Sequence, residues 1–194
     1  MMPNKKTIGI TGAGGSLGKA LTKKFRSHGH KIIGFTHNRK PVELVEEGPN
    51  EWVYWECGKE FLLENSLSKI DILILNHGIY DYQQDLEKSI EINATSKIKI
   101  LNLFEKISLS QSIESSPKEI WINTSEAEIL PALNPCYEIS KSLIGQVVTF
   151  KRNFNNQNKL RNLIIKKIIL GPFKSDLNPI GIMSPESVAS LIFY

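Results

Sequence analysis

A glycine-rich stretch near the N-terminus is the feature that most constrains how this chain can fold. Residues 11–18 read Thr-Gly-Ala-Gly-Gly-Ser-Leu-Gly, after a predicted strand at 6–11 and before a predicted helix that ends near Gly29. Glycines let the backbone approach a pyrophosphate, and a helix N-terminus offers free N–H groups. The order strand, glycine turn, helix predicts a dinucleotide site, with a tight turn that binds no ligand as the alternative. The candidate cofactor-binding residues of the turn are Gly12, Gly14, Gly15, Ser16, Leu17 and Gly18.

The residues that follow the second predicted strand, 31–36, bear on which dinucleotide would bind. An NAD site usually carries an acidic residue here to hold the ribose 2′-hydroxyl. This chain has Thr36, His37, Asn38 and Arg39, and its first carboxylate after them is Glu43. A carboxylate would repel a 2′-phosphate, whereas an arginine grips it with a planar fork. The sequence therefore favours NADP(H) over NAD(H), and a solvated basic loop is the alternative.

Strands and helices alternate along the rest of the chain. Further strands are predicted at 52–55, 71–75, 119–123 and 163–170, short helices at 41–47 and 61–67, and longer helices at 86–107, 135–154 and 187–194. The helix 86–107 has a possible break near Asn93. This alternation predicts an α/β fold, a three-layer doubly wound parallel sheet of about six to seven strands. No internal repeat or linker is present, so we expect residues 1–194 to form one domain.

Several loops follow predicted strands at the edge where a doubly wound sheet binds ligands. Glu56 and Cys57 are placed to flank an adenine. Asn76, His77 and Gly78 should face the cofactor, and we interpret His77 as packing beside it rather than as catalytic. The segment Thr124-Ser125 puts a hydroxyl at the end of a central strand, which is a candidate site residue or an ordinary Ser/Thr turn.

Tyr137 and Lys141 are four residues apart on a predicted helix, so their side chains share one face. An ammonium beside a phenol favours the phenolate, and such a tyrosine can exchange a proton near neutral pH. The pair on its own is a weak signal, because two unrelated residues on a solvated helix face give the same spacing. The pair becomes a stronger indication of a catalytic site because a glycine turn and an alternating order of strands and helices precede it.

Bulk composition excludes several classes of protein. Net charge is +4 and the isoelectric point is near 9.0, without a basic block typical of a nucleic-acid-binding arm. The two cysteines have no metal-ligand spacing, and no apolar run has the length that spans a bilayer. We therefore expect a cytoplasmic protein without a nucleic-acid or membrane partner. The chain ends on an uncapped apolar run, which predicts either a truncated form of a longer protein or an end that is buried against a partner.

With these residues placed, the chain resembles the short-chain dehydrogenase/reductase family over nearly its full length. Residues 11–18 are similar to the family's Thr-Gly-x-x-x-Gly-x-Gly loop with Ser16 in place of the middle glycine, or to the Gly-x-x-Gly-x-x-Gly loop of the epimerase-like branch. Residues 76–78 resemble the end of the Asn-Asn-Ala-Gly motif, and 137–141 match Tyr-x-x-x-Lys. Gly171 and Pro172 resemble the Pro-Gly corner in reversed order, and belong to the cofactor-binding candidates.

The resemblance implies a Rossmann fold, a nicotinamide cofactor and an oxidoreductase mechanism. Tyr137 would be the general acid or base, and Lys141 would favour its phenolate and bind the nicotinamide ribose. Ser125 would polarise the substrate oxygen, with Thr124 as the other candidate hydroxyl, and Asn93 would hold a water that links Lys141 to solvent. The substrate implied is a small carbonyl or alcohol, and a homodimer or tetramer is implied through the helices 86–107 and 135–154.

Two alternatives to this enzyme remain open from the sequence. A sensor or scaffold that binds NADP but has little catalysis is favoured by the short segment between Pro172 and the final helix, where the family carries its substrate loop. An epimerase or dehydratase of nucleotide sugars is favoured by the Gly-x-x-Gly-x-x-Gly spacing. The same short segment argues against that reading, because a nucleotide sugar needs a larger cap.

Overall fold

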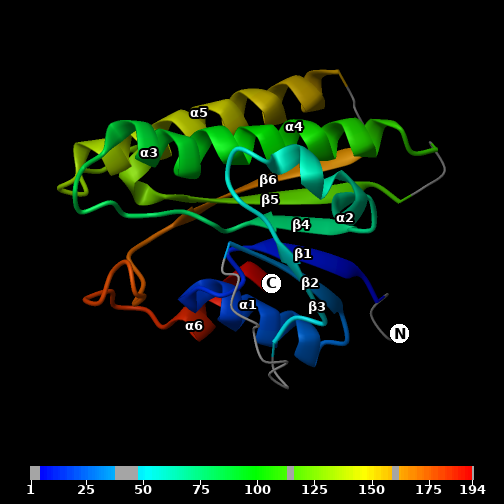
Figure 1. Cartoon of the computed structure of the whole chain (residues 1–194), viewed down its shortest axis with the longest axis horizontal. Coiled ribbons are helices and arrows are strands. Elements are labelled where there is room, and N and C mark those ends of the chain that lie inside the picture. The colour runs from blue at the N-terminus through cyan, green and yellow to red at the C-terminus, as the bar shows by residue number, and fades with distance from the viewer. Residues whose placement is uncertain (1–4, 38–47, 113–115, 159–161, 194) are drawn as a thin grey trace.

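The computed structural model describes residues 5–37, 48–112, 116–158 and 162–193. Within these ranges six strands form one parallel sheet in the order β3-β2-β1-β4-β5-β6 (Figure 1). The strands are β1 (Thr7–Thr11), β2 (Lys31–Thr36), β3 (Glu51–Tyr54), β4 (Ile72–Leu75), β5 (Lys118–Ser125) and β6 (Leu163–Leu170). The predicted doubly wound α/β fold is confirmed, whereas the predicted helix at 41–47 lies outside the described residues.

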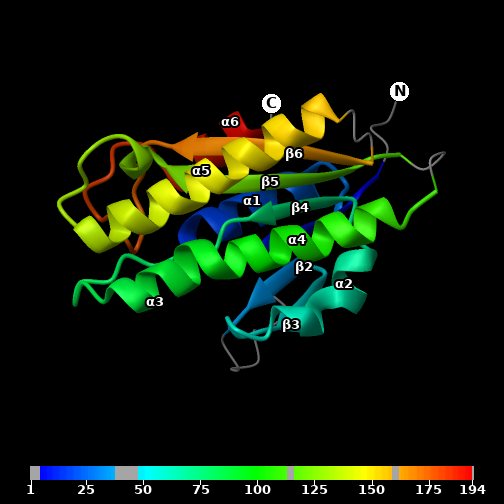
Figure 2. The same ribbon diagram turned by 90° about the horizontal axis from the view of Figure 1, so that it is seen from above.

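Helices cover both faces of the sheet, which makes three layers (Figures 1 and 2). One face carries α1 (Ser16–Ser27) and α6 (Pro185–Phe193). The other face carries α2 (Glu64–Ser68), α3 (Leu86–Ile90), α4 (Ser96–Leu109) and α5 (Pro135–Gln157). No helix of the described ranges is long and apolar enough to cross a membrane.

The alternation of strand side chains produces two separate cores. Ile8 and Ile10 of β1 face α1 and α6, where they pack in the cluster that contains Leu21. Leu73 and Leu75 of β4 point to the opposite face, where they pack in the cluster that contains α4 and α5. A parallel sheet has helices on both faces, so its central strands are apolar at every position rather than at alternate ones. β4 shows this pattern, because its four residues, Ile-Leu-Ile-Leu, are all buried.

The predicted break in the long helix is confirmed as a π-helical segment, η2 (Glu91–Thr95), between α3 and α4. Asn93 lies in this segment and is fully buried. A π-turn inside an α-helix often marks a functional site. β5 is longer than predicted and runs to Ser125, because it pairs with β6 at all eight positions.

The strand order reverses between β1 and β4. The chain passes from β1 outward to β2 and β3, and then returns to β4 on the other side of β1. A crevice opens outside the carboxyl ends of the strands at such a switch point, and ligands of open α/β sheets bind there. The glycine turn follows β1 and the Asn76–Gly78 loop follows β4, so both flank this crevice.

Candidate active site

The glycine turn contains three glycines with different roles, two of them steric. Gly12 has a φ of +66°, and a Cβ there would lie 2.9 Å from the His77 Cα. Gly15 is the N-cap of α1, and its N–H donates to the Gly12 carbonyl at 3.1 Å. A Cβ on Gly18 would lie 2.1 Å from the Gly12 oxygen, so only glycine lets α1 pack this closely on the turn.

The other candidates of the turn have different environments. A Cβ on Gly14 would meet nothing within 4 Å, and Leu17 is buried in the core on the α1 face. Ser16 is the first residue of α1, and its hydroxyl accepts a hydrogen bond from the Asp176 N–H at 3.4 Å. The sterically demanding positions are therefore 12 and 18, whereas a Cβ on Gly15 would lie at an ordinary contact distance of 3.5 Å from the Gly12 oxygen.

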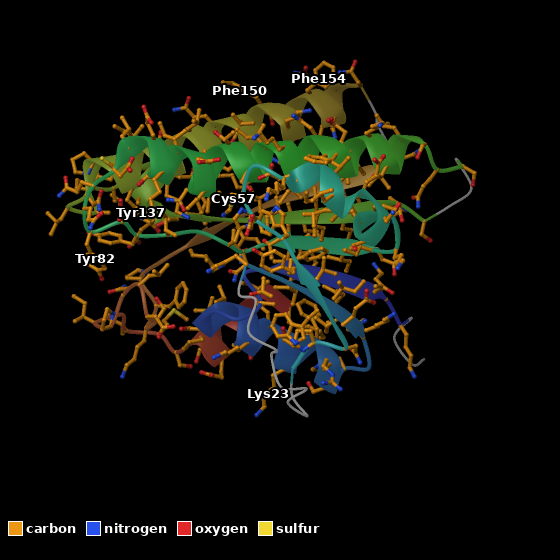
Figure 3. The ribbon with its side chains drawn as sticks, viewed as in Figure 1. Lys23, Cys57, Tyr82, Tyr137, Phe150 and Phe154 are labelled. Atoms are coloured by element: carbon orange, nitrogen blue, oxygen red, sulfur yellow. The ribbon has the colours of Figure 1, made fainter. Side chains whose placement is uncertain are left out.

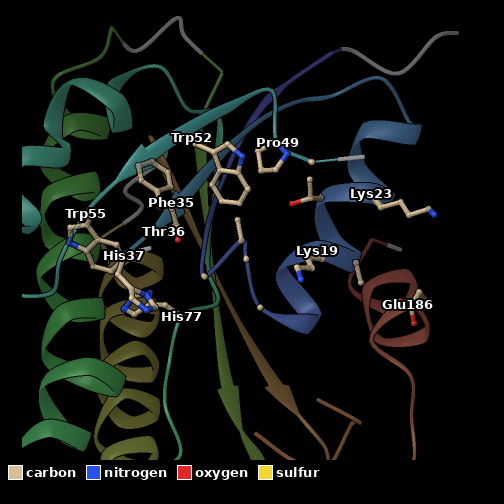
Figure 4. Close-up of a pocket in the computed structure, with 17 residues that line it drawn as sticks. Lys19, Lys23, Phe35, Thr36, His37, Pro49, Trp52, Trp55, His77 and Glu186 are labelled. Atoms are coloured by element: carbon tan, nitrogen blue, oxygen red, sulfur yellow. The ribbon is translucent and has the colours of Figure 1, made fainter. Parts of the chain in front are cut away.

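A cavity of about 780 Å³ lies beside the turn (Figure 4). Six of the predicted cofactor-binding residues line it: Gly12, Gly14, Gly15, Thr36, His37 and His77. The sequence analysis missed other lining residues, among them Lys19, Lys23, Pro49, Trp52, Trp55 and Glu186. Two lysines from α1 and the α1 N-terminus put positive charge on this wall, beside the carboxylate of Glu186, and two indoles give the opposite part an apolar surface (Figure 4). These features suit a flat base joined to phosphates.

Several predicted cofactor-binding residues are not part of the cavity lining. The Glu56 carboxylate pairs with Lys59 at 2.9 Å and accepts from Tyr54, and Cys57 packs against the core of the α4 face, where burial raises the pKa of its thiol. Gly171 and Pro172 are exposed after β6. Asn38 and Arg39 lie outside the described residues, so the preference for NADP(H) stays a prediction.

His77 forms a buried wall between the cavity and the interior. Its Nδ1 is 2.8 Å from the Thr11 hydroxyl, and its ring stands edge-to-face with Trp55 at a centroid distance of 4.9 Å. Burial holds the pKa of His77 well below its usual value of 6.5, and the charges of Lys97 and Lys141 lower it further. The ring is therefore neutral, and it packs beside the cavity as the sequence interpretation had it.

Gly78 joins the cavity region to the predicted catalytic residues. A Cβ on Gly78 would lie 2.8 Å from the Asn93 Oδ1 and 3.3 Å from the Lys141 Nζ. The Asn93 Oδ1 accepts from the Ile79 N–H at 2.8 Å, and its Nδ2 donates to the Ile79 carbonyl and the Ser140 hydroxyl, both at 3.0 Å. These bonds fix the buried amide between the β4 loop and α5.

Tyr137 lies in the first turn of α5, where the Asn134 side chain caps the helix by accepting from the Tyr137 N–H at 3.0 Å. The Lys141 Nζ lies 5.1 Å from the centroid of the Tyr137 ring, which confirms the predicted shared helix face. Tyr80 packs on the other side of the phenol at a centroid distance of 5.2 Å. Lys141 is buried and Tyr137 is half-buried, so the pair is sheltered but reachable.

The two candidate hydroxyls at the end of β5 differ in their environment. Thr124 is buried, and its hydroxyl donates to the Ile168 carbonyl of β6 at 3.2 Å. Ser125 is half-buried at the strand end, and its hydroxyl accepts from the Ala127 N–H at 3.2 Å. The Ser125 hydroxyl still has a proton to donate toward a ligand, whereas that of Thr124 is used within the sheet.

Lys97 is a buried cation that the sequence analysis did not anticipate. It lies one helical turn after Asn93, and its Nζ donates to the Asn123 carbonyl at 2.9 Å. Burial lowers the pKa of Lys97 well below its usual value, and the charge of Lys141 adds to the effect. Among the described residues, no carboxylate forms an ion pair with it.

The fold described above is shared with known proteins. The family model of the NAD dependent epimerase/dehydratase family matches residues 8–164. The chain belongs to this family. The family is related to the short-chain dehydrogenase/reductases, so the predicted resemblance holds at the level of that larger group, and the match is to its epimerase branch.

A relative and two solved structures define the similarity further. The monoglucosyldiacylglycerol epimerase of Synechocystis sp. is 39% identical over 191 residues, which are 95% of this chain and 45% of that protein. The chain thus spans about half the length of this curated relative. A short-chain dehydrogenase from Burkholderia cenocepacia in complex with NADP has a TM-score of 0.80 at 14% identity, covering 98% of this chain and 83% of that one. Serine dehydrogenase from Escherichia coli has a TM-score of 0.77 at 19% identity, with coverages of 96% and 89%.

Proposed function

We propose that the chain is an NADP(H)-dependent oxidoreductase that acts on a C–OH or C=O group, with Tyr137 as its general acid and base. The observation that carries the proposal is a continuous series of neighbouring residues that leads from the glycine turn to the Tyr137 phenol. The His77 backbone packs on Gly12, Gly78 touches Asn93 and Lys141, and the Lys141 ammonium lies over the Tyr137 ring. We expect a ligand that binds at the turn to extend from the cavity, whose lining ends at His77, along the β4 loop toward Tyr137.

The cofactor would supply or accept a hydride at a carbon of the substrate. Gly12, Gly15 and the α1 N-terminus would hold its pyrophosphate, and Lys19 and Lys23 add positive charge at the same wall. Trp52 and Trp55 offer faces for the adenine. Arg39 would bind the 2′-phosphate, and its replacement by alanine should weaken NADPH binding while NADH binding stays the same.

The residues near Tyr137 would then move one proton. In the oxidation direction the phenolate takes the hydroxyl proton of the substrate, and in reduction the phenol returns it to the carbonyl oxygen. Lys141 favours the phenolate, and the Ser125 hydroxyl donates to the substrate oxygen where negative charge develops. Asn93 holds the β4 loop against α5, and so keeps Lys141 in place.

Epimerisation of a sugar carbon is a second candidate, favoured by the matching family and by the relative that is named an epimerase. The same residues would serve it. Oxidation removes a hydride from the carbon and a proton from its hydroxyl, which gives a ketone. Return of the hydride to the opposite face of the ketone carbon, and of the proton to its oxygen, inverts the centre with no net redox change. The relative's name denotes a glucosylated diacylglycerol, so a glycolipid sugar is the first substrate to test.

Two measurements test the proposal on the full chain. Binding of NADPH and NADH is measured by calorimetry, and turnover is measured with a panel of ketones and aldehydes and with glucolipids, whose epimers are separated by chromatography. Turnover of any of these that needs the nicotinamide supports the proposal. Dinucleotide binding without turnover would favour the sensor, and no binding of either dinucleotide would contradict both.

We also propose that copies of the chain pair through α4 and α5. Phe150 and Phe154 of α5 are large, exposed side chains away from the Tyr137 end of the helix (Figure 3). They lie on a helix that this larger group of enzymes uses for association, and two exposed phenylalanines favour burial against a partner. Sedimentation should give a dimer or tetramer, and a Phe150→Ser, Phe154→Ser double variant should shift it toward monomer.

A further inference from the structure

The most exposed apolar side chains of the described residues gather at one place. The five highest exposures among large apolar side chains run from 71% to 93%, and all occur in the loops that follow β4, β5 and β6. We call these five the apolar rim: Tyr82, Ile129, Leu133, Ile180 and Ile182. Figures 1 and 2 show that the three loops lie at the same end of the molecule, beside the start of α5. An exposed apolar cluster beside a candidate site indicates a binding partner.

Leu133 is the most exposed member of the rim and the one with an unusual backbone. Its φ is +59°, in the left-handed region that favours glycine. Its side chain is 93% exposed, so neither local geometry nor core packing accounts for a leucine here. Strained backbone of this kind clusters at ligand-binding sites, where a contact in the bound state offsets its cost.

The loop that carries Ile180 and Ile182 is folded back on itself. The Lys174 N–H donates to the Met183 carbonyl at 2.8 Å, and the Ser175 N–H donates to the Asn178 carbonyl at 3.0 Å. A Cβ on Gly181 would lie 2.0 Å from the Phe173 carbonyl carbon, so the two isoleucines flank a close backbone contact. The fold of the loop therefore holds both isoleucines outward.

A stack of aromatic rings connects the rim to the candidate catalytic phenol. Tyr82 packs on Tyr80 at a centroid distance of 5.1 Å, and Tyr80 packs on Tyr137 at 5.2 Å. The Tyr80 hydroxyl donates to the carbonyl of Ala132, next to Leu133, at 3.5 Å. The apolar rim is thus continuous with the site (Figure 3 shows Tyr82 and Tyr137 at the same end).

We propose that the substrate is amphiphilic, with a polar head at Tyr137 and a long acyl or alkyl chain along the apolar rim. This deepens the proposed function and rests on it. The loops 126–134 and 171–184 carry one lysine, Lys174, and the carboxylates of Glu126, Glu128 and Asp176, of which Glu128 is paired with Lys167 of β6. Such loops do not attract an anionic head group, so an uncharged lipid such as a glycolipid fits best.

The test compares two glucosides that differ only in the apolar chain, methyl glucoside and octyl glucoside below its micelle concentration. Binding to the full chain with NADPH present is measured by calorimetry, and turnover is followed in parallel. Octyl glucoside should bind at least about tenfold more tightly, because several CH₂ groups leave water. Equal dissociation constants for the two glucosides would overturn the proposal.

Substitutions in the apolar rim test whether it causes the difference in affinity between the two glucosides. The triple change Leu133→Ser, Ile180→Ser, Ile182→Ser should remove most of the octyl advantage and leave methyl glucoside unchanged. Phe61→Ser, at a 69% exposed side chain outside the three loops, should leave both unchanged. Leu133→Gly should raise the melting temperature and still weaken octyl glucoside binding, which a purely structural leucine would not do. If the octyl advantage persists in the triple variant, the rim is not the binding surface.

The proposed function can fail separately. A chain that binds octyl glucoside through the rim but turns over neither glucoside keeps this inference and contradicts catalysis. A chain that turns over methyl glucoside as efficiently as octyl glucoside keeps the proposed function and contradicts this inference.

Discussion

The two sides of the candidate site achieve their geometry in different ways. Beside β1, the glycine turn works through backbone, because Gly12, Gly15 and Gly18 offer space and N–H groups and no side chain. Beside β5 and α5, the chemistry depends on side chains, and Asn93 and Lys141 are held by hydrogen bonds and packing from distant segments. We therefore expect the glycine turn to lose its geometry when a side chain is added to it, and the α5 side of the site to lose its function when side-chain atoms are removed.

The largest effect should come from a change beside β5 and α5, in the half of the site that depends on side chains, and it should appear as a loss of turnover. Tyr137→Phe removes one oxygen and leaves the ring packed between Lys141 and Tyr80. Turnover should fall by about 10²–10⁴-fold, the usual contribution of a positioned acid or base. Calorimetry should show unchanged NADPH affinity, because the glycine turn is intact. A fully active Phe variant would remove Tyr137 from the mechanism.

The backbone half should respond to a single added methyl group. In Gly18→Ala the new Cβ meets the Gly12 oxygen at 2.1 Å, so the turn must shift. We expect a loss of about 1–3 kcal/mol in the free energy of unfolding, together with weaker dinucleotide binding. Gly14→Ala is the matched control, since its Cβ enters open space. Equal denaturation midpoints for the two variants would contradict the steric assignment.

Lys97→Met, beside Asn93 and Lys141, should raise the free energy of unfolding of the chain. The folded chain holds Lys97 with a lowered pKa, whereas the unfolded chain keeps its proton up to a pH of about 10.5. Folding at neutral pH therefore costs free energy that methionine does not, and we expect a gain of about 1 kcal/mol. The gain should shrink as the pH rises toward 10.5. Lys106→Met is the control, because it removes an exposed lysine of the same helix and leaves the buried one in place.

The smallest effect concerns His77, at the boundary between the two halves. Its pKa is lowered in the folded chain, so below about pH 6.5 the unfolded chain binds more protons and stability falls with falling pH. His77→Gln should flatten this part of the stability curve, measured by urea unfolding between pH 5 and 8. His28→Gln is the control, because it changes an exposed ring and leaves the buried one. An unchanged slope in His77→Gln would show that other groups cause it.

The sequence predicted those features that depend on local pattern. Strand periodicity and the glycine spacing located β1, α1 and the turn, and Tyr137 with Lys141 fell on one helix face as helical geometry requires. The break near Asn93 was also readable, although its π-helical form was not. That form depends on hydrogen bonds from Asn93 to Ile79 and Ser140, which no local pattern encodes.

The sequence did not predict features that depend on packing between segments far apart in the chain. Trp52 and Trp55 were recognised as strand residues but not as cavity lining, because the pairing of β3 with β2 decides which of its side chains lie near the turn. A lysine in an apolar stripe reads as a solvated position, yet Lys97 is buried under the end of β5. That residues 1–194 form one domain stays a prediction.

The π-turn that holds Asn93 has a consequence for how such a site can arise. A π-turn contains one residue more than the α-turn it interrupts. Because the π-turn absorbs that extra residue locally, deleting one residue from 91–95 would let α3 and α4 join as a regular α-helix with little change in their relative rotation, and would move the Asn93 amide from its place beside Gly78. A single codon gained or lost here would therefore place the Asn93 amide in the candidate site or remove it, without altering any strand of the sheet.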